Sequence, residues 1–191
     1  FDALTNIGAD GEPQPWLATE WKAETPTRWV FKLRPGVTFS NGVPFTAEAV
    51  VSATKFLISP EATGERVAEE FTNVLGAEAR DPLTVVFHLR TPDVLFPRAV
   101  SMLNIVEPGA WSRLGREEFA KQPVGTGPFL AQAWKPASAA LTAFKGSWRA
   151  PKIDALEVLA LPDATSRVQG LLSGHIDLAM ILGPDSTDTV E

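Results

Sequence analysis

Two segments of the chain alternate between apolar and polar side chains, which is the period of a β-strand with one buried face. They cover residues 29–34 and residues 84–90, and both contain the same order of apolar and basic residues, VFKLR in the first and VFHLR in the second. This likeness predicts that the two strands lie in one antiparallel sheet. The side chains predicted to face inward are Trp29, Phe31, Leu33, Val85, Phe87 and Leu89.

Helical spacing of apolar residues follows the first of these strands. It predicts a helix over residues 47–57, with Thr46 as its N-cap. Residues 61–80 are polar and rich in alanine, which favours a second helix followed by a loop. Short helices are also predicted for residues 94–102 and 108–121.

The last third of the chain is predicted to contain strands around one helix. Residues 129–134 and 139–144 are expected to form a hairpin, and residues 153–161 and 176–181 are apolar enough for buried strands. Between the latter two, Asp163 can cap a helix, so the order strand, helix, strand predicts a right-handed βαβ unit. The helix residues predicted to face inward are Val168, Leu171 and Leu172.

Composition excludes several classes of function. The chain has 191 residues, 45% of them hydrophobic and 21% charged, which is typical of a soluble globular protein. Its net charge of −6 argues against a nucleic-acid partner, because phosphate binding needs a basic face. The absence of cysteine excludes disulfides, thiolate metal sites and cysteine nucleophiles.

Few side chains are arranged for chemistry. The two histidines, His88 and His175, have no second histidine or carboxylate at ligand spacing. The carboxylate pairs at residues 69–70 and 117–118 fall in polar predicted helices, where solvation explains them. The sequence therefore indicates no catalytic residue, no metal site and no cofactor, and it predicts a binding scaffold rather than an enzyme.

The segment at residues 123–129, PVGTGPF, is the most distinctive turn in the chain. Gly125 and Gly127 permit positive φ and Pro128 fixes φ near −65°, so the motif predicts a tight corner that leads into a strand. It is not a phosphate-binding loop, because no lysine follows it and Pro128 lacks an amide hydrogen. We assign Gly125, Thr126, Gly127 and Pro128 to backbone geometry.

Four blocks of sequence, in this order, resemble the extracellular solute-binding proteins of family 5, the receptors of peptide and nickel ABC importers. They are residues 15–21 (PWLATEW), residues 29–50 (WVFKLRPGVTFSNGVPFTAEAV), the corner at residues 123–129, and residues 162–177 (PDATSRVQGLLSGHID). Together the blocks span nearly the whole chain. Four places depart from the family's usual residues: Asn41 and Ala49 replace aspartate, Phe129 replaces tyrosine, and residues 146–148 (GSW) stand where an asparagine and a tyrosine–tryptophan pair are common.

This resemblance implies a mixed α/β (α+β) fold of the periplasmic binding protein type, class II, in which two lobes close on a ligand. Residues 1–8 and 123–183 are then expected to belong to lobe I, and residues 9–122 to a subdomain inserted into it. Residues 184–191 would begin the hinge and lobe II, the rest of which is missing. The chain is accordingly expected to be a fragment, because family members are more than twice as long.

The resemblance also implies a function, namely the substrate-binding component of an ABC importer. Such a receptor would hand a small solute, most plausibly a dipeptide or oligopeptide, to permease subunits in the membrane. It would reside in the periplasm or outside the cell, with a lipid anchor as one possibility. A sensor module of a solute-responsive transcription regulator is the alternative, because some regulators carry a similar module.

Four residues are candidates for ligand contact. The loop containing Ser101, Met102 and Asn104 combines a flexible thioether with an amide, and methionine suits adaptable binding surfaces. The competing interpretation places Met102 in the core. Phe71 is a further candidate, implied by the ligand contacts of the subdomain in the family.

Overall fold

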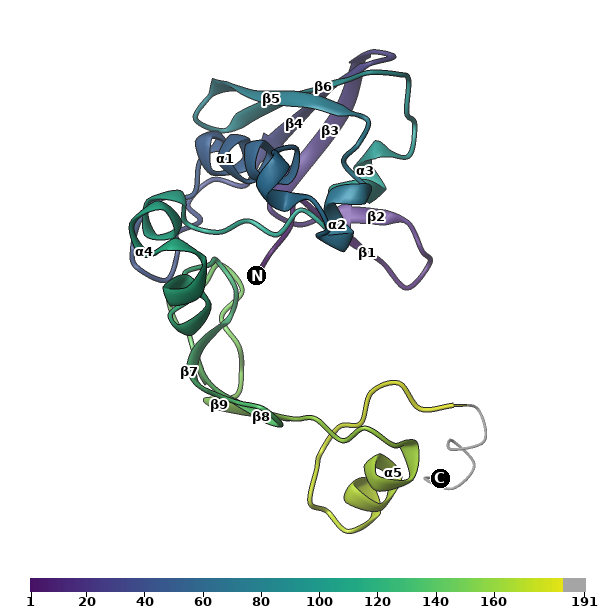
Figure 1. Cartoon of the computed structure of the whole chain (residues 1–191), viewed down its shortest axis with the longest axis vertical. Coiled ribbons are helices and arrows are strands. Elements are labelled where there is room, and N and C mark those ends of the chain that lie inside the picture. The colour runs from purple at the N-terminus through teal and green to yellow at the C-terminus, as the bar shows by residue number, and fades with distance from the viewer. Residues whose placement is uncertain (184–191) are drawn as a thin grey trace.

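The computed structural model describes residues 1–183, which form a broad N-terminal body and a thinner C-terminal extension (Figure 1). The body contains a two-stranded ribbon, β1 (Thr5–Ile7) and β2 (Pro13–Pro15), and a four-stranded antiparallel sheet. The order of strands in that sheet is β3-β4-β6-β5. Their bounds are Ala18–Thr25 for β3, Arg28–Leu33 for β4, Val74–Asp81 for β5 and Thr84–Leu89 for β6.

The predicted pairing of the two alternating strands is confirmed. Strands β4 and β6 are antiparallel neighbours, with Phe31 opposite Val85 and Trp29 opposite Phe87. The side chains predicted to face inward are buried except Trp29, which is half-buried. Val30 and Val86, on the opposite face, are buried as well, so burial is not confined to one face of these strands. The phenyl rings of Phe31 and Phe87 meet edge to face, with centroids 5.5 Å apart.

Helix α1 (Ala47–Leu57) has the predicted bounds and packs against strand β5. It buries Ala47, Ala49, Val50 and Thr54. Thr46 occupies the N-cap position but makes no side-chain hydrogen bond to the helix. The Ala47 amide instead donates to the Pro82 carbonyl at 2.9 Å, so tertiary contact replaces the predicted capping bond.

The prediction for residues 61–80 is wrong in its second half. Only a 3-10 turn, η1 (Pro60–Ala62), and a short helix, α2 (Arg66–Glu69), form in its first half, and strand β5 begins at Val74. Alanine and glutamate favour helices, but backbone pairing with β6 determines the conformation of this edge strand.

The next two helices agree with prediction to different degrees. Helix α3 (Phe96–Ala99) is shorter than the predicted helix over residues 94–102, because Val94 and Leu95 remain exposed and outside it. Helix α4 (Pro108–Lys121) has the predicted bounds. It is kinked at Gly115, where φ is 69°, a value that favours glycine.

The C-terminal extension contains an antiparallel sheet in the order β7-β8-β9. Strands β7 (Phe129–Lys135) and β8 (Ser138–Ala143) form the predicted hairpin. Helix α5 (Ala164–Leu172) begins as predicted at Asp163, whose Oδ1 accepts a hydrogen bond of 2.7 Å from the Ser166 amide.

Three expectations for this extension are wrong. Strand β9 (Ala155–Leu159) is mostly exposed rather than buried, residues 176–181 form no strand, and Leu172 is 53% exposed. The βαβ unit is therefore absent among the described residues. An apolar segment becomes a strand only where a neighbouring strand pairs with it, and within residues 1–183 none pairs with residues 176–181.

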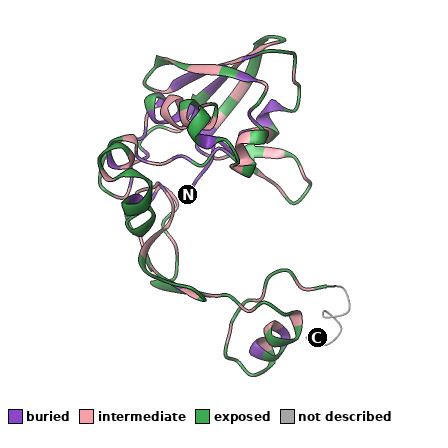
Figure 2. Ribbon diagram, in the orientation of Figure 1, coloured by how far each residue is buried: buried purple, intermediate pink, exposed green. Residues whose placement is uncertain are grey.

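Burial differs sharply between the two parts (Figure 2). One continuous hydrophobic core lies in the N-terminal body and reaches from Leu4 to Ile105, with Trp21 and Trp29 half-buried at its edge. Within residues 1–183, no helix has both the length and the apolar character needed to span a membrane. The predicted start of lobe II, residues 184–191, lies outside the described residues.

Candidate ligand-binding site

A pocket of about 220 Å³ opens between α1, α4 and the segment that joins α3 to α4. We call it the Trp111 pocket. Its lining is mostly apolar, with a few polar groups, which is the usual character of a small-molecule site. The side chains that line it include Ser52, Phe56, Glu65, Val67, Met102, Asn104, Val106 and Trp111.

An aromatic pair forms one wall of the Trp111 pocket. Phe56 from α1 and Trp111 from α4 meet edge to face, with ring centroids 5.3 Å apart. Trp111 also packs against Phe119 at 5.2 Å, so it is supported on the side of its own helix. Rings supported in this way form a rigid surface that binds apolar groups with little loss of conformational entropy.

A buried carboxylate fixes the start of α4 and hence the position of Trp111. Glu107 accepts hydrogen bonds of 2.7 Å from the amides of both Gly109 and Ala110, which places a negative charge at the positive end of the helix. Its Oε2 also accepts a bond of 3.0 Å from Asn41 Nδ2. Glu107 could not be predicted as a cap from the sequence, because glutamate is not among the residues usually preferred at the N-cap.

The structure brings together two of the four predicted ligand residues. Met102, 38% exposed, and Asn104 both line the Trp111 pocket. Ser101 does not line it, and the Ser101 hydroxyl donates to the Arg98 carbonyl at 2.7 Å. Phe71 is buried in the core and lies 31 residues earlier in the chain than Met102, on the wall of another pocket.

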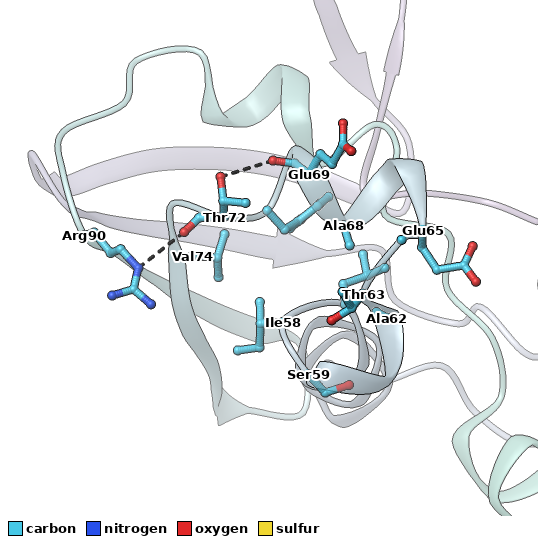
Figure 3. A pocket seen from close by; sticks show the side chains of 13 residues that line it. Ile58, Ser59, Ala62, Thr63, Glu65, Ala68, Glu69, Thr72, Val74 and Arg90 are labelled. Carbon is cyan, nitrogen blue, oxygen red and sulfur yellow. Dashed lines mark hydrogen bonds between the residues drawn. The ribbon is translucent and has the colours of Figure 1, made fainter.

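That other pocket lies between the end of α1, α2 and strand β5, and its volume is about 450 Å³ (Figure 3). Its lining is more polar. Arg90 Nε donates to the Thr72 carbonyl at 3.3 Å, and the Thr72 hydroxyl donates to the Glu69 carbonyl at 3.1 Å. These groups bind one another, whereas the Trp111 pocket presents rings and a thioether, so we take the latter as the candidate site.

The aromatic wall was not predicted. Phe56 and Trp111 are 55 residues apart and belong to two different helices, and no local pattern in the sequence indicates that these helices meet. One signal was available: Trp111 is a large aromatic residue directly before two polar residues, Ser112 and Arg113, in its helix. Tryptophan at such a position often marks a binding surface.

The corner at residues 123–129 does not use positive φ. Neither Gly125 nor Gly127 has a positive φ value, so the predicted reason for these glycines is wrong. Gly125 is explained by close approach, because a Cβ there would lie 2.7 Å from a ring carbon of Phe1. The Pro128 carbonyl accepts from the Phe144 amide at 2.7 Å, which connects the corner to the C-terminal sheet.

A buried carboxylate stands beside this corner. Asp2 accepts hydrogen bonds from the Thr126 hydroxyl at 2.8 Å and from the indole nitrogens of Trp16 and Trp148 at 3.1 Å each. Arg149 donates to it from Nε at 3.0 Å and also from Nη2. Burial raises the pKa of Asp2. Hydrogen bonds from Arg149, Thr126 and Trp148, together with the positive charge of Arg149, outweigh this effect and lower the pKa below its ordinary value.

Comparison of the fold and the sequence with known proteins defines the class to which the chain belongs. The structure matches that of OppA from Burkholderia pseudomallei with a TM-score of 0.88 and 24% identity, over 100% of this chain and 42% of that one. Residues 12–191 match the profile of the bacterial extracellular solute-binding proteins, family 5. The chain belongs to this family, and the predicted fold class is confirmed.

Two curated relatives point to different biological settings. The chain is 27% identical over 184 residues to the probable D,D-dipeptide-binding periplasmic protein DdpA of Escherichia coli, covering 92% of this chain and 35% of DdpA. It is 28% identical over 167 residues to the HTH-type transcriptional regulator SgrR of Pectobacterium atrosepticum, covering 85% of this chain and 28% of SgrR. The chain thus spans about a third or less of the length of these relatives.

Proposed function

We propose that the chain is part of the substrate-binding component of an ABC importer and that it captures a dipeptide or oligopeptide. The observation that carries this proposal is the Trp111 pocket in a chain of family 5. Phe56, Trp111 and Met102 would receive an apolar side chain of the peptide. Asn104 would bind its backbone, because an amide side chain both donates and accepts hydrogen bonds.

The division into lobes is part of the same proposal. Residues 1–8 and 123–183 would belong to lobe I, residues 9–122 to the inserted subdomain, and residues 184–191 would begin lobe II. Exposed apolar side chains in the C-terminal extension support this division, because further chain packed there would cover them. They include Ile153, Leu156, Val158, Leu178, Met180 and Ile181.

Capture between two lobes would proceed through hinge closure, in which the ligand favours the closed state. The closed receptor would then dock on permease subunits, in the periplasm or outside the cell. The chain itself would do no chemistry, and the described residues contain no group of three histidine, aspartate or glutamate side chains suited to a metal ion. We propose no nucleic-acid contact within residues 1–191.

The second candidate function is a sensor module of a transcription regulator, which the likeness to SgrR favours. The two functions predict different cellular compartments. Fractionation of cells that express the native gene, followed by immunoblotting, separates them. A periplasmic or extracellular product supports the importer, whereas a cytoplasmic product supports the regulator.

Calorimetry of the full-length protein tests the proposed site. A panel of dipeptides that contain phenylalanine, leucine or glycine, and of tripeptides with one of these at the centre, is titrated, with a histidine–nickel complex as comparator. We expect the peptides with an apolar side chain to bind most tightly, and Trp111→Ala to weaken them by roughly tenfold or more. Trp134→Ala is the matched control, because Trp134 is 58% exposed on β7 and does not line the pocket.

The result for Trp111→Ala decides the proposal. Equal losses from both tryptophan variants, or no binding of any peptide in the panel, would refute peptide capture by this pocket. Tighter binding of the nickel complex than of every peptide would change the substrate class.

A further inference from the structure

Asp2, a buried residue, contacts both the segment that lines the Trp111 pocket and the C-terminal extension. We infer that Asp2 is a positioning residue for ligand binding, which holds the pocket-lining segment at residues 104–107 in register with the corner at residues 124–126. The inference rests on the proposed function. It concerns a residue that does not itself line the pocket.

The main chain of Asp2 fixes the pocket-lining segment directly. Asp2 and Ile105 form an isolated antiparallel bridge, in which the Ile105 amide donates to the Asp2 carbonyl at 2.9 Å. Ile105 is fully buried and stands between Asn104 and Val106, both of which line the pocket. A shift of the Asp2 backbone therefore moves two lining residues together.

The side chain of Asp2 holds the corner at residues 124–126. Thr126, at the centre of the corner, donates its hydroxyl to Asp2 Oδ2, and Arg149 donates to Oδ1. The guanidinium of Arg149 lies 4.9 Å from the ring centroid of Trp16, and Arg34 lies 4.5 Å from that of Trp148. These stacked cations keep the two indole donors directed at the carboxylate.

A second connection runs parallel to the first. The Glu107 amide donates to the Val124 carbonyl at 3.1 Å, and the Ser40 amide donates to the Gly125 carbonyl at 2.9 Å. The Glu107 side chain also accepts from Asn41, the neighbour of Ser40. The segment at residues 104–107 is thus held to the corner at both of its ends, by Asp2 and by Glu107.

Loss of the carboxylate has a defined local consequence. In Asp2→Asn, the amide nitrogen would face indole and guanidinium donors, so at least one donor would lose its acceptor. Thr126→Val removes one donor and leaves the charge pair between Asp2 and Arg149 in place. Thr54→Val is the matched control, because it also removes a buried hydroxyl, the one that donates to the Val50 carbonyl at 2.8 Å in α1.

Hydrogen exchange and calorimetry on the full-length protein test this role, with the alanine–phenylalanine–alanine tripeptide as the probe. In Asp2→Asn and Thr126→Val, we expect the amides of Ile105 and Glu107 to exchange roughly tenfold faster or more, while amides of β4 and β6 keep their protection. Tripeptide affinity should fall by roughly tenfold in Asp2→Asn. Thr54→Val should change neither the exchange of those two amides nor the affinity.

The possible outcomes separate positioning from general stabilisation. Unchanged exchange at Ile105 and Glu107, or equally faster exchange throughout β4 and β6, would overturn the inference. Unchanged affinity in Asp2→Asn would overturn it as well. If the wild-type protein binds neither the tripeptide nor any other peptide of the panel, the proposed function fails, and the exchange pattern alone decides the positioning role.

Discussion

The N-terminal body and the C-terminal extension of this chain are stabilised in different ways. The body, up to about residue 122, buries a continuous core with six phenylalanines, Phe31, Phe39, Phe45, Phe71, Phe87 and Phe96. In the extension between residues 130 and 183, the buried apolar side chains are Ala139 and Val168. Hydrophobic burial therefore stabilises the first part, whereas the second depends on strand pairing and helix caps, which contribute less.

The largest difference in the free energy of unfolding is expected between an alanine substitution in the body and one in the extension. Phe31→Ala removes a fully buried ring from the core and should lower the free energy of unfolding by about 3–5 kcal/mol. Leu156→Ala, at a side chain that is 37% exposed on β9, should cost less than about 1 kcal/mol in residues 1–191. Urea unfolding monitored by circular dichroism measures both, and equal losses would show that the contrast between the parts is false.

The next effect concerns the residue that joins the two parts. Asp2→Asn should lower the free energy of unfolding at pH 7 by about 1.5–3 kcal/mol, because buried donors lose their charged acceptor. The folded pKa of Asp2 lies below its ordinary value of 3.8, so its contribution is complete above pH 3.8 and is lost as the pH falls through the folded pKa.

Unfolding of wild type and Asp2→Asn at pH 7, 4 and 3 measures this contribution. The difference between the two proteins should be largest at pH 7 and should shrink below pH 4. A difference that grows on acidification would contradict the sign of the pKa shift.

A smaller loss of stability is expected from substitution of the residue that caps helix α4, which lies between the two parts. Glu107→Ala removes the acceptor of two helix amides and of Asn41, and should cost about 1–2 kcal/mol. Glu117→Ala is the control, because Glu117 lies exposed within the same helix. Thermal unfolding of both variants measures the difference, and equal midpoints would refute the capping role.

The sequence allowed the body to be predicted better than the extension. Alternation at residues 29–34 and 84–90 identified β4 and β6, because one face of each strand packs on the core. The same reasoning failed at residues 176–181, where apolar residues have no neighbouring strand among the described residues. Strand β5 was missed because its alanines and glutamate favour a helix until β6 pairs with it.

The candidate site could be predicted only in part. Met102 and Asn104 were identified from residue type within one loop, and both line the pocket. The aromatic wall requires residues from two helices. The Asp2 cluster joins residues up to 147 positions apart, a separation over which local patterns carry no information.

We propose that residues 1–191 supply only part of the contacts to a ligand that is held between two lobes. Calorimetric titration of one tripeptide into the full-length protein and into residues 1–191 tests it most directly. We predict that the shorter chain binds at least about 100-fold more weakly, because contacts from a second lobe are lost. Equal affinities would contradict the account.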